Sequence, residues 1–229
     1  MMFGKSSGPG QLVTEGDNWV LIDFIGEEKI NLAKDICETV WDFDYSEMTT
    51  AKGSNSFQNY LVNPSWMPLE DFKESDRWPE LRDLWTELVQ REIINHGLLP
   101  HTWTNLEVQG AWTVTGQEGS YHTVHDHGTG KISTVTYLDV PDNQEYPQGD
   151  IFFVLHGNSY NEISMPMHRV FTVKPQPGMI IMFPSWIVHG VYPQGKGLRR
   201  TLNVDFTGYL DKSLEIDLES RSSGTIRFN

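Results

Sequence analysis

The stretch Tyr121-His122-Thr123-Val124-His125-Asp126-His127 is the part of the sequence that decides the fold. It places two histidines, His125 and His127, at positions i and i+2. In an extended strand these positions project from the same face, so the two imidazoles would lie side by side. A third histidine, His189, lies on another strand-like segment much further along the chain. Three imidazoles drawn from distant segments form a ligand set for a single divalent metal ion.

The segment around these histidines has the pattern of an all-β domain. From Thr102 to Tyr209, short runs of β-branched and aromatic residues alternate with Gly, Pro, Asn and Asp, which predicts strands separated by turns. The expected strands are Ile132–Val140, Asp150–Leu155, Val170–Val173, Met179–Phe183, Ile187–Tyr192 and Thr201–Phe206. Many short strands of this kind are typical of a sandwich or a jelly roll, which brings distant strands to one ligand-binding mouth.

The first hundred residues have helical spacing instead. Leu32, Ile36 and Val40 recur every four residues and predict a helix over Glu27–Phe43. A second helix is expected over Pro79–Asn95, with Pro79 in its first turn and Gly97 as its C-terminal cap. We therefore expect one structural domain in three parts. These are a helical and irregular supporting region (1–100), a β core (101–210) and a polar tail (211–229).

Composition excludes several classes of partner. The chain has 229 residues, 12% of them aromatic, and this is the composition of a folded globular protein. Its net charge of −14, with only 17 Lys and Arg, argues against a nucleic acid or an anionic membrane as partner. No apolar run is long enough to span a bilayer. The single cysteine, Cys37, excludes an intrachain disulfide, and the expected location is the cytoplasm.

An arginine pair follows the third histidine. If Pro193–Gly197 is the loop of a hairpin, His189 and Arg200 become direct cross-strand neighbours. A guanidinium beside a metal ion is unfavourable unless an anion bridges the two, so Arg200 would bind the carboxylate of a ligand whose other end binds the metal. Arg199 has the opposite strand parity and is expected to be a solvated charge. His122, opposite in parity to His125, is expected at the surface or rim.

These residues resemble the 2-oxoglutarate- and Fe(II)-dependent oxygenases of the prolyl-4-hydroxylase-like clan, which includes small bacterial and phage versions. The resemblance covers about Trp112 to Phe206, and the N-terminal hundred residues do not contribute to it. The matching positions are Trp112, Gly119, His125, His127, Ser133, Tyr137, Val173-Lys174-Pro175, Gly178, Phe183-Pro184-Ser185-Trp186, His189 and Arg200.

The resemblance implies a mainly β protein with a double-stranded β-helix core. Iron would be held by His125, His127 and His189, and 2-oxoglutarate, the cosubstrate, by Arg200. Tyr137 is a candidate hydroxyl donor to the cosubstrate, with plain packing as the alternative. The implied activity is that of a dioxygenase, a hydroxylase that releases succinate and CO2. It would act on an unidentified small-molecule or peptide substrate.

Three alternatives remain open at this stage. Most of the wider superfamily has a carboxylate where this chain has His127, and a bulge could turn Asp126 inward to supply one. A cupin-like metalloenzyme with three histidines could act without 2-oxoglutarate, although Arg200 argues against this. A metal-free jelly-roll binding module is the third possibility, and the convergence of three histidines argues against it.

Overall fold

A computed structural model describes residues 10–15, 17–41, 56–62, 72, 74–98, 105–128, 131–142, 144–156 and 168–209. Within these ranges the chain forms two helices and eleven strands. The helices are α1 Glu27–Trp41 and α2 Trp78–Asn95. The strands are β1 Gln11–Glu15, β2 Asn18–Phe24, β3 Ser56–Tyr60, β4 Asn105–Gly116, β5 His122–His125, β6 Lys131–Asp139, β7 Ile151–His156, β8 His168–Val173, β9 Met179–Pro184, β10 Val188–Val191 and β11 Arg199–Tyr209. All six predicted strands are present.

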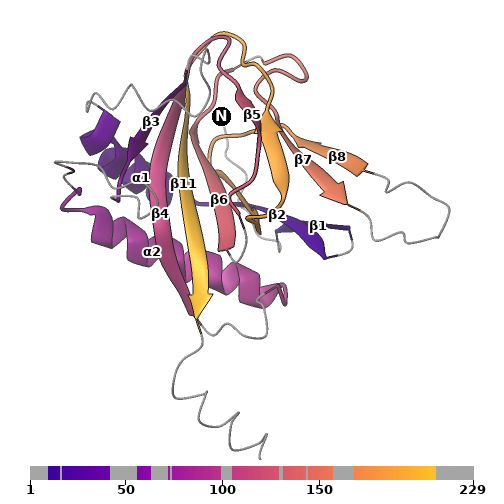
Figure 1. The fold of residues 1–229 in the computed structure, drawn as a ribbon. Helices are drawn as coiled ribbons and strands as arrows, with labels where there is room; N and C mark the ends of the chain where they lie inside the picture. The colour runs from indigo at the N-terminus through magenta and orange to yellow at the C-terminus, as the bar shows by residue number, and fades with distance from the viewer. Residues whose placement is uncertain are drawn as a thin grey trace, which may run out of the picture.

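Two antiparallel sheets form the jelly roll. The larger sheet has the order β1-β2-β9-β6-β11-β4-β3, and the smaller has the order β5-β10-β7-β8. In Figure 1 the smaller sheet faces the concave side of the larger one. Buried side chains between the sheets, such as Phe153, Ile181 and Phe183, form the barrel core. The predicted mainly β fold, a jelly-roll core with helices packed on it, is confirmed.

Both helices cover the outer face of the larger sheet (Figure 1). Ile36 of α1 and Trp85 of α2 are fully buried there, in one cluster with Phe206 of β11. The Trp85 indole Nε1 donates a hydrogen bond to Thr136 Oγ1 at 3.2 Å, which fixes α2 on β6. α2 ends at Asn95, and Gly97 just beyond it has a φ of 64°, a conformation that favours glycine. The helices thus pack against the larger sheet on the face opposite the smaller sheet.

The N-terminal region also supplies strands that the sequence patterns did not predict. β1 and β2 extend one edge of the larger sheet through the pairing of β2 with β9, and β3 extends the other edge by pairing with β4. The boundaries at residues 100 and 210 stay predictions, while Phe43 and the tail 211–229 lie outside the described residues. Neither helix in the described part of the chain has the length and apolar character needed to cross a bilayer.

Alternation along β11 determines which side chains reach the barrel interior. Leu202, Val204 and Phe206 are fully buried in the cluster shared with the helices. The odd-numbered residues of this part of β11 alternate with them and therefore project from the opposite face of the strand, toward the smaller sheet. These are Arg199, Thr201, Asn203 and Asp205, and all four line one pocket. A row of polar groups is thus carried into the mouth of an otherwise apolar barrel.

Candidate metal centre

Three histidines converge at the mouth of the barrel. One ring nitrogen from each of His125, His127 and His189 lies within 4.8 Å of the others. His125 ends β5 and pairs directly with His189 of β10. His127 follows the strand, and its backbone N–H donates to Ser185 O at 2.9 Å, which holds the residue beside the other two. The predicted convergence of the three side chains is therefore present, and their role as metal ligands is a proposal.

Hydrogen bonds orient all three rings. His125 Nδ1 lies 2.7 Å from Thr123 O, and His189 Nδ1 lies 2.9 Å from Ile187 O. His127 Nδ1 is 3.0 Å from a carboxylate oxygen of Asp205. When Nδ1 donates to an oxygen, the proton is fixed on that atom and Nε2 keeps its lone pair. The site can therefore present three Nε2 lone pairs to one metal ion.

Burial favours the neutral form of His125 and His189, the form that binds a metal. Desolvation lowers the pKa of His189 well below its usual value, and the neighbouring imidazoles lower it further. Desolvation also lowers the pKa of His125, against a raising effect of its hydrogen bond to Thr123. His189 packs between aromatic rings, with its centroid 4.8 Å from that of Phe183. A ring held neutral in an apolar wall is ready to donate its lone pair to a metal ion.

Asp126 does not join the cluster. Its side chain is exposed, and its carboxylate accepts a hydrogen bond from the backbone N–H of Gly128 at 2.9 Å. This interaction closes the turn after His127, as Asp commonly does in loops. Among the described residues, the group that could hold a metal contains His125, His127 and His189 and no carboxylate.

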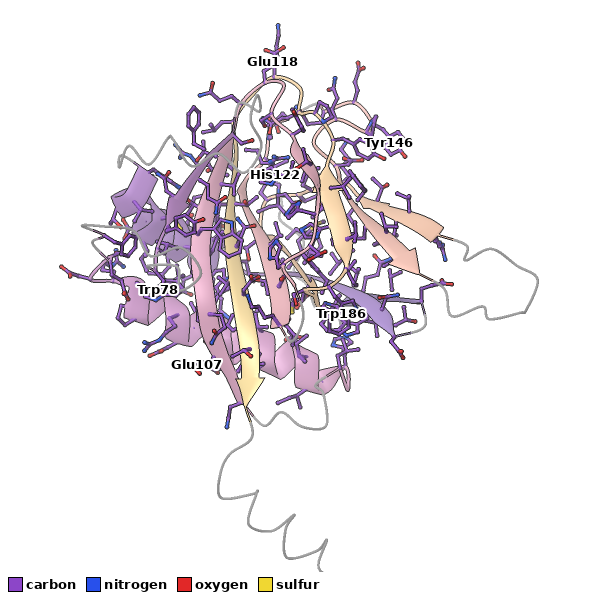
Figure 2. All side chains as sticks on the ribbon, in the orientation of Figure 1. Trp78, Glu107, Glu118, His122, Tyr146 and Trp186 are labelled. Atoms are coloured by element: carbon purple, nitrogen blue, oxygen red, sulfur yellow. The ribbon has the colours of Figure 1, made fainter. Side chains whose placement is uncertain are left out.

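The expectation that His122 lies at the surface or rim is wrong. Between β5 and β10, His125 pairs with His189 but His122 pairs with Val191, so β5 has an extra residue and a bulge. The bulge reverses the parity of His122 and turns it into the pocket, and Figure 2 shows it between the sheets. Burial, reinforced by Arg199, lowers its pKa to about 3. Its buried Nε2 has no hydrogen-bond partner in the described structure.

The predicted placement of Arg200 is also wrong. β10 pairs with β5 and β7, whereas β11 pairs with β4 and β6, so the expected hairpin between β10 and β11 does not form. Arg200 lies on the helix side of β11. There its guanidinium stacks 3.9 Å from the ring centroid of Trp41 and contacts Asp139 at 3.9 Å. It is therefore separated from the histidines by the sheet.

Arg199 occupies the pocket instead. It is only 3% exposed, and its Nη1 donates a long 3.4 Å hydrogen bond to Gly149 O. No carboxylate in the described ranges forms an ion pair with it. Burial lowers the pKa of Arg199, with Tyr137 acting in the opposite direction. A buried guanidinium without a counterion is costly, so the pocket is suited to an anionic ligand.

The pocket has a volume of about 450 Å³ and contains the three histidines, His122 and Arg199. Tyr137, which was predicted to face the site, lines it and is 1% exposed. Burial raises the pKa of Tyr137, which keeps its hydroxyl proton available for donation. Tyr60 and Trp112 form an aromatic side of the same pocket. The space is large enough for a small metal-bound ligand with room beside it.

Asp205 was not predicted from the sequence as a contributor to the site, and Ser133 was named only as a position that matches the family. Asp205 and Ser133 are cross-strand partners on β11 and β6, and both contact His127 Nδ1, the serine through its Oγ at 3.1 Å. A signal for Asp205 exists, because residues 199–206 alternate polar with apolar from Thr201 onward. That alternation also assigns Arg199 to the polar face and Arg200 to the apolar face.

This fold and site define a jelly-roll protein with a candidate three-histidine metal centre and a buried arginine in the same pocket. Residues 110–205 match the family model described as "Putative 2OG-Fe(II) oxygenase". The matched segment extends from β4 to Asp205 and includes all three histidines. This segment of the chain is therefore similar to the 2OG-Fe(II) oxygenases. No curated protein matches the sequence.

Solved structures of low sequence identity share the fold. A prolyl-4-hydroxylase from Pseudomonas putida is 14% identical, with a TM-score of 0.54 over 86% of this chain and 95% of that one. The carbocyclase SnoK from nogalamycin biosynthesis is 15% identical, with a TM-score of 0.58 over 88% and 85%. HygX from Streptomyces hygroscopicus, with nickel, 2-oxoglutarate and hygromycin B bound, is 10% identical, with a TM-score of 0.53 over 82% of each chain.

Proposed function

We propose that this protein is an Fe(II)- and 2-oxoglutarate-dependent hydroxylase in which His125, His127 and His189 bind the iron and Arg199 binds the cosubstrate. The observation that carries the proposal is the pairing, in one pocket, of three convergent imidazoles with a buried guanidinium that has no carboxylate partner among the described residues. 2-Oxoglutarate is a dianion that can bind a metal at one end and a guanidinium at the other. It could therefore bind to a metal held by the three imidazoles and to the Arg199 guanidinium at the same time.

The residues fit the metal. Three imidazole nitrogen donors would suit a ferrous ion, and a ligand set of three side chains would leave room in the pocket for a cosubstrate. When bound, the iron supplies the oxidising chemistry that couples decarboxylation of 2-oxoglutarate to hydroxylation, with release of succinate and CO2. The chain holds the three donors in place, with His189 fixed between β5 and β7 in the centre of the smaller sheet.

Arg199, His122 and Tyr137 would hold the cosubstrate. The planar guanidinium of Arg199 has paired N–H donors that suit a bidentate contact with a carboxylate. His122 is neutral and has a ring nitrogen without a partner in the described structure, so it can add a hydrogen bond to a ligand. The Tyr137 hydroxyl, protonated because it is buried, is a further donor. Together they replace the water that a dianion loses on entering the pocket.

The aromatic side of the pocket would receive the primary substrate, a small molecule or a peptide. Gln58 Nε2 donates to Tyr60 Oη at 2.8 Å, and its Oε1 is buried without a hydrogen-bond partner in the described structure. A substrate with an N–H or O–H group could satisfy that oxygen beside the ring of Trp112. For the location we propose the cytoplasm, which is supported by the single cysteine, free and buried in α1.

Consumption of 2-oxoglutarate tests this function. The purified protein, loaded with Fe(II) in air, should form succinate from 2-oxoglutarate, and a screen of small molecules and peptides should find those that stimulate the rate. His189→Ala, analysed in parallel, should form none. If iron binds but 2-oxoglutarate is never consumed, the donor set of three histidines would favour the cupin-like metalloenzyme. If no metal binds, the jelly-roll binding module would replace both enzymes.

A further inference from the structure

The three histidines are oriented by different kinds of acceptor. The Nδ1 atoms of His125 and His189 contact neutral backbone carbonyls, each two residues earlier in the chain. His127 Nδ1 faces a carboxylate, with distances of 3.0 and 3.2 Å to the two oxygens of Asp205. Only this ring therefore has a negative charge directly behind it among the described residues.

Asp205 is held in place to make this contact. It is 3% exposed and lies on the pocket face of β11, between Val204 and Phe206, which anchor the strand on the helix side. Ser133, its cross-strand partner, places a hydroxyl 3.1 Å from the same Nδ1. A carboxylate withdrawn from water needs a strong donor, and the His127 N–H supplies one.

We propose that Asp205 is a positioning residue that orients His127 and supplies, from behind the ring, the negative charge absent from a three-histidine centre. A carboxylate bonded to one nitrogen of an imidazole raises the basicity of the other, which strengthens its bond to a metal. Three neutral imidazoles leave the charge of the ion uncompensated. Asp205 lowers the net charge of the centre by one without touching the metal. This inference rests on the proposed iron site.

The geometry has a consequence for substitutions at position 127. From the strand pattern alone, His127→Asp would restore the commoner set of two histidines and one carboxylate. With Asp205 in place, the new carboxylate would face a second buried carboxylate that has lost its N–H donor. Like charges this close in a buried site repel strongly. His127→Asp should therefore damage the site, and Asp205→Asn in the same chain should repair it.

Binding of Fe(II) and Co(II) to the whole protein, measured anaerobically by competition with a chromogenic chelator, tests the proposal. D205N, which keeps the shape and a hydrogen-bond acceptor but loses the charge, should weaken metal binding by about 10- to 100-fold. D126N removes the same charge from the neighbouring exposed turn and should stay within about twofold. H127D should bind poorly, and H127D/D205N should bind more tightly than H127D by about tenfold or more.

The outcomes separate this inference from the proposed function. If the wild type binds no metal, the iron site itself is wrong. If the wild type binds metal and D205N matches D126N, Asp205 is only a packed acceptor and the inference fails. Circular dichroism with chelator present checks that each variant is folded. If D205N is unfolded, H127D alone decides, and an affinity of H127D equal to that of the wild type would overturn the proposal.

Discussion

Arg199 and Arg200 offer a matched pair of substitutions with opposite expected effects. Arg199→Gln removes a buried guanidinium from the pocket, whereas Arg200→Gln removes one that stacks on Trp41 behind the sheet. Losing one side of a buried charge-assisted contact costs about 2 to 5 kcal/mol. Since about 1.4 kcal/mol is a factor of ten, Arg199→Gln should raise the Kd for 2-oxoglutarate by roughly 30- to 4,000-fold. Iron affinity should change little.

Arg200→Gln should instead affect stability. Its cation–π contact with Trp41, at 3.9 Å, contributes about 1 kcal/mol for a partly exposed pair. A loss of this size lowers the Tm of a chain this long by about 2 to 4 °C. The Kd for 2-oxoglutarate should stay within about twofold of wild type, because the sheet separates Arg200 from the pocket.

Two assays measure this pair. Anaerobic titration of the Fe(II)-loaded protein with 2-oxoglutarate gives the Kd, and thermal unfolding of the metal-free protein gives the Tm. Arg199→Lys keeps the charge but not the fork, and should bind with intermediate affinity. The reasoning would be refuted if Arg200→Gln lost 2-oxoglutarate binding while Arg199→Gln kept it, since the face assignment of β11 would then be inverted.

Two further predictions concern His122 and Gly116. Because the folded pKa of His122, about 3, lies below its ordinary value of 6.5, the unfolded chain binds a proton that the folded chain does not. The free energy of unfolding should therefore fall as pH drops from 6.5 toward 3, by at most about 1.4 kcal/mol per pH unit. Urea unfolding at pH 7 and pH 5 should show a smaller loss of stability for His122→Asn than for wild type. Equal losses would argue against a buried neutral ring. A Cβ at Gly116 would lie 2.4 Å from Ser120 Oγ and 3.3 Å from Arg199 Nη2. Gly116→Ala should therefore displace the guanidinium and weaken 2-oxoglutarate binding, as measured by the same titration. An unchanged affinity would show that the loop accommodates the methyl group.

Much of the fold could be predicted from local patterns. Short runs of β-branched and aromatic residues bounded by turn residues predicted the strands from β6 to β11, and helical spacing of apolar residues predicted both helices. The convergence of the three histidines followed from the jelly roll, which places β5 beside β10. Strands β1 to β4 were missed. β2 pairs with β9 and β3 with β4, and such tertiary pairing overrides the local propensity of a segment.

The errors at the site have the same physical origin, since long-range pairing overrides local parity. Arg200 was misplaced because the chain after β10 crosses to the other sheet instead of returning as a hairpin. The apolar residues Leu202, Val204 and Phe206 share its parity and mark the core face, so the sequence did contain the information needed to choose Arg199. A bulge moved His122, and bulges leave no clear local signal. The role of Asp205 could not be predicted, because its contact with His127 exists only after the fold brings β11 beside that residue.

The most direct test of the account is whether 2-oxoglutarate binding depends on a metal held by the three histidines. Under anaerobic conditions, one equivalent of Fe(II) followed by 2-oxoglutarate should give a visible metal-to-ligand charge-transfer band that saturates at one cosubstrate per chain. The band should be absent without iron and in His189→Ala. Failure of the wild type to develop the band, with no change in its Tm on adding 2-oxoglutarate, would contradict the assignment of this pocket.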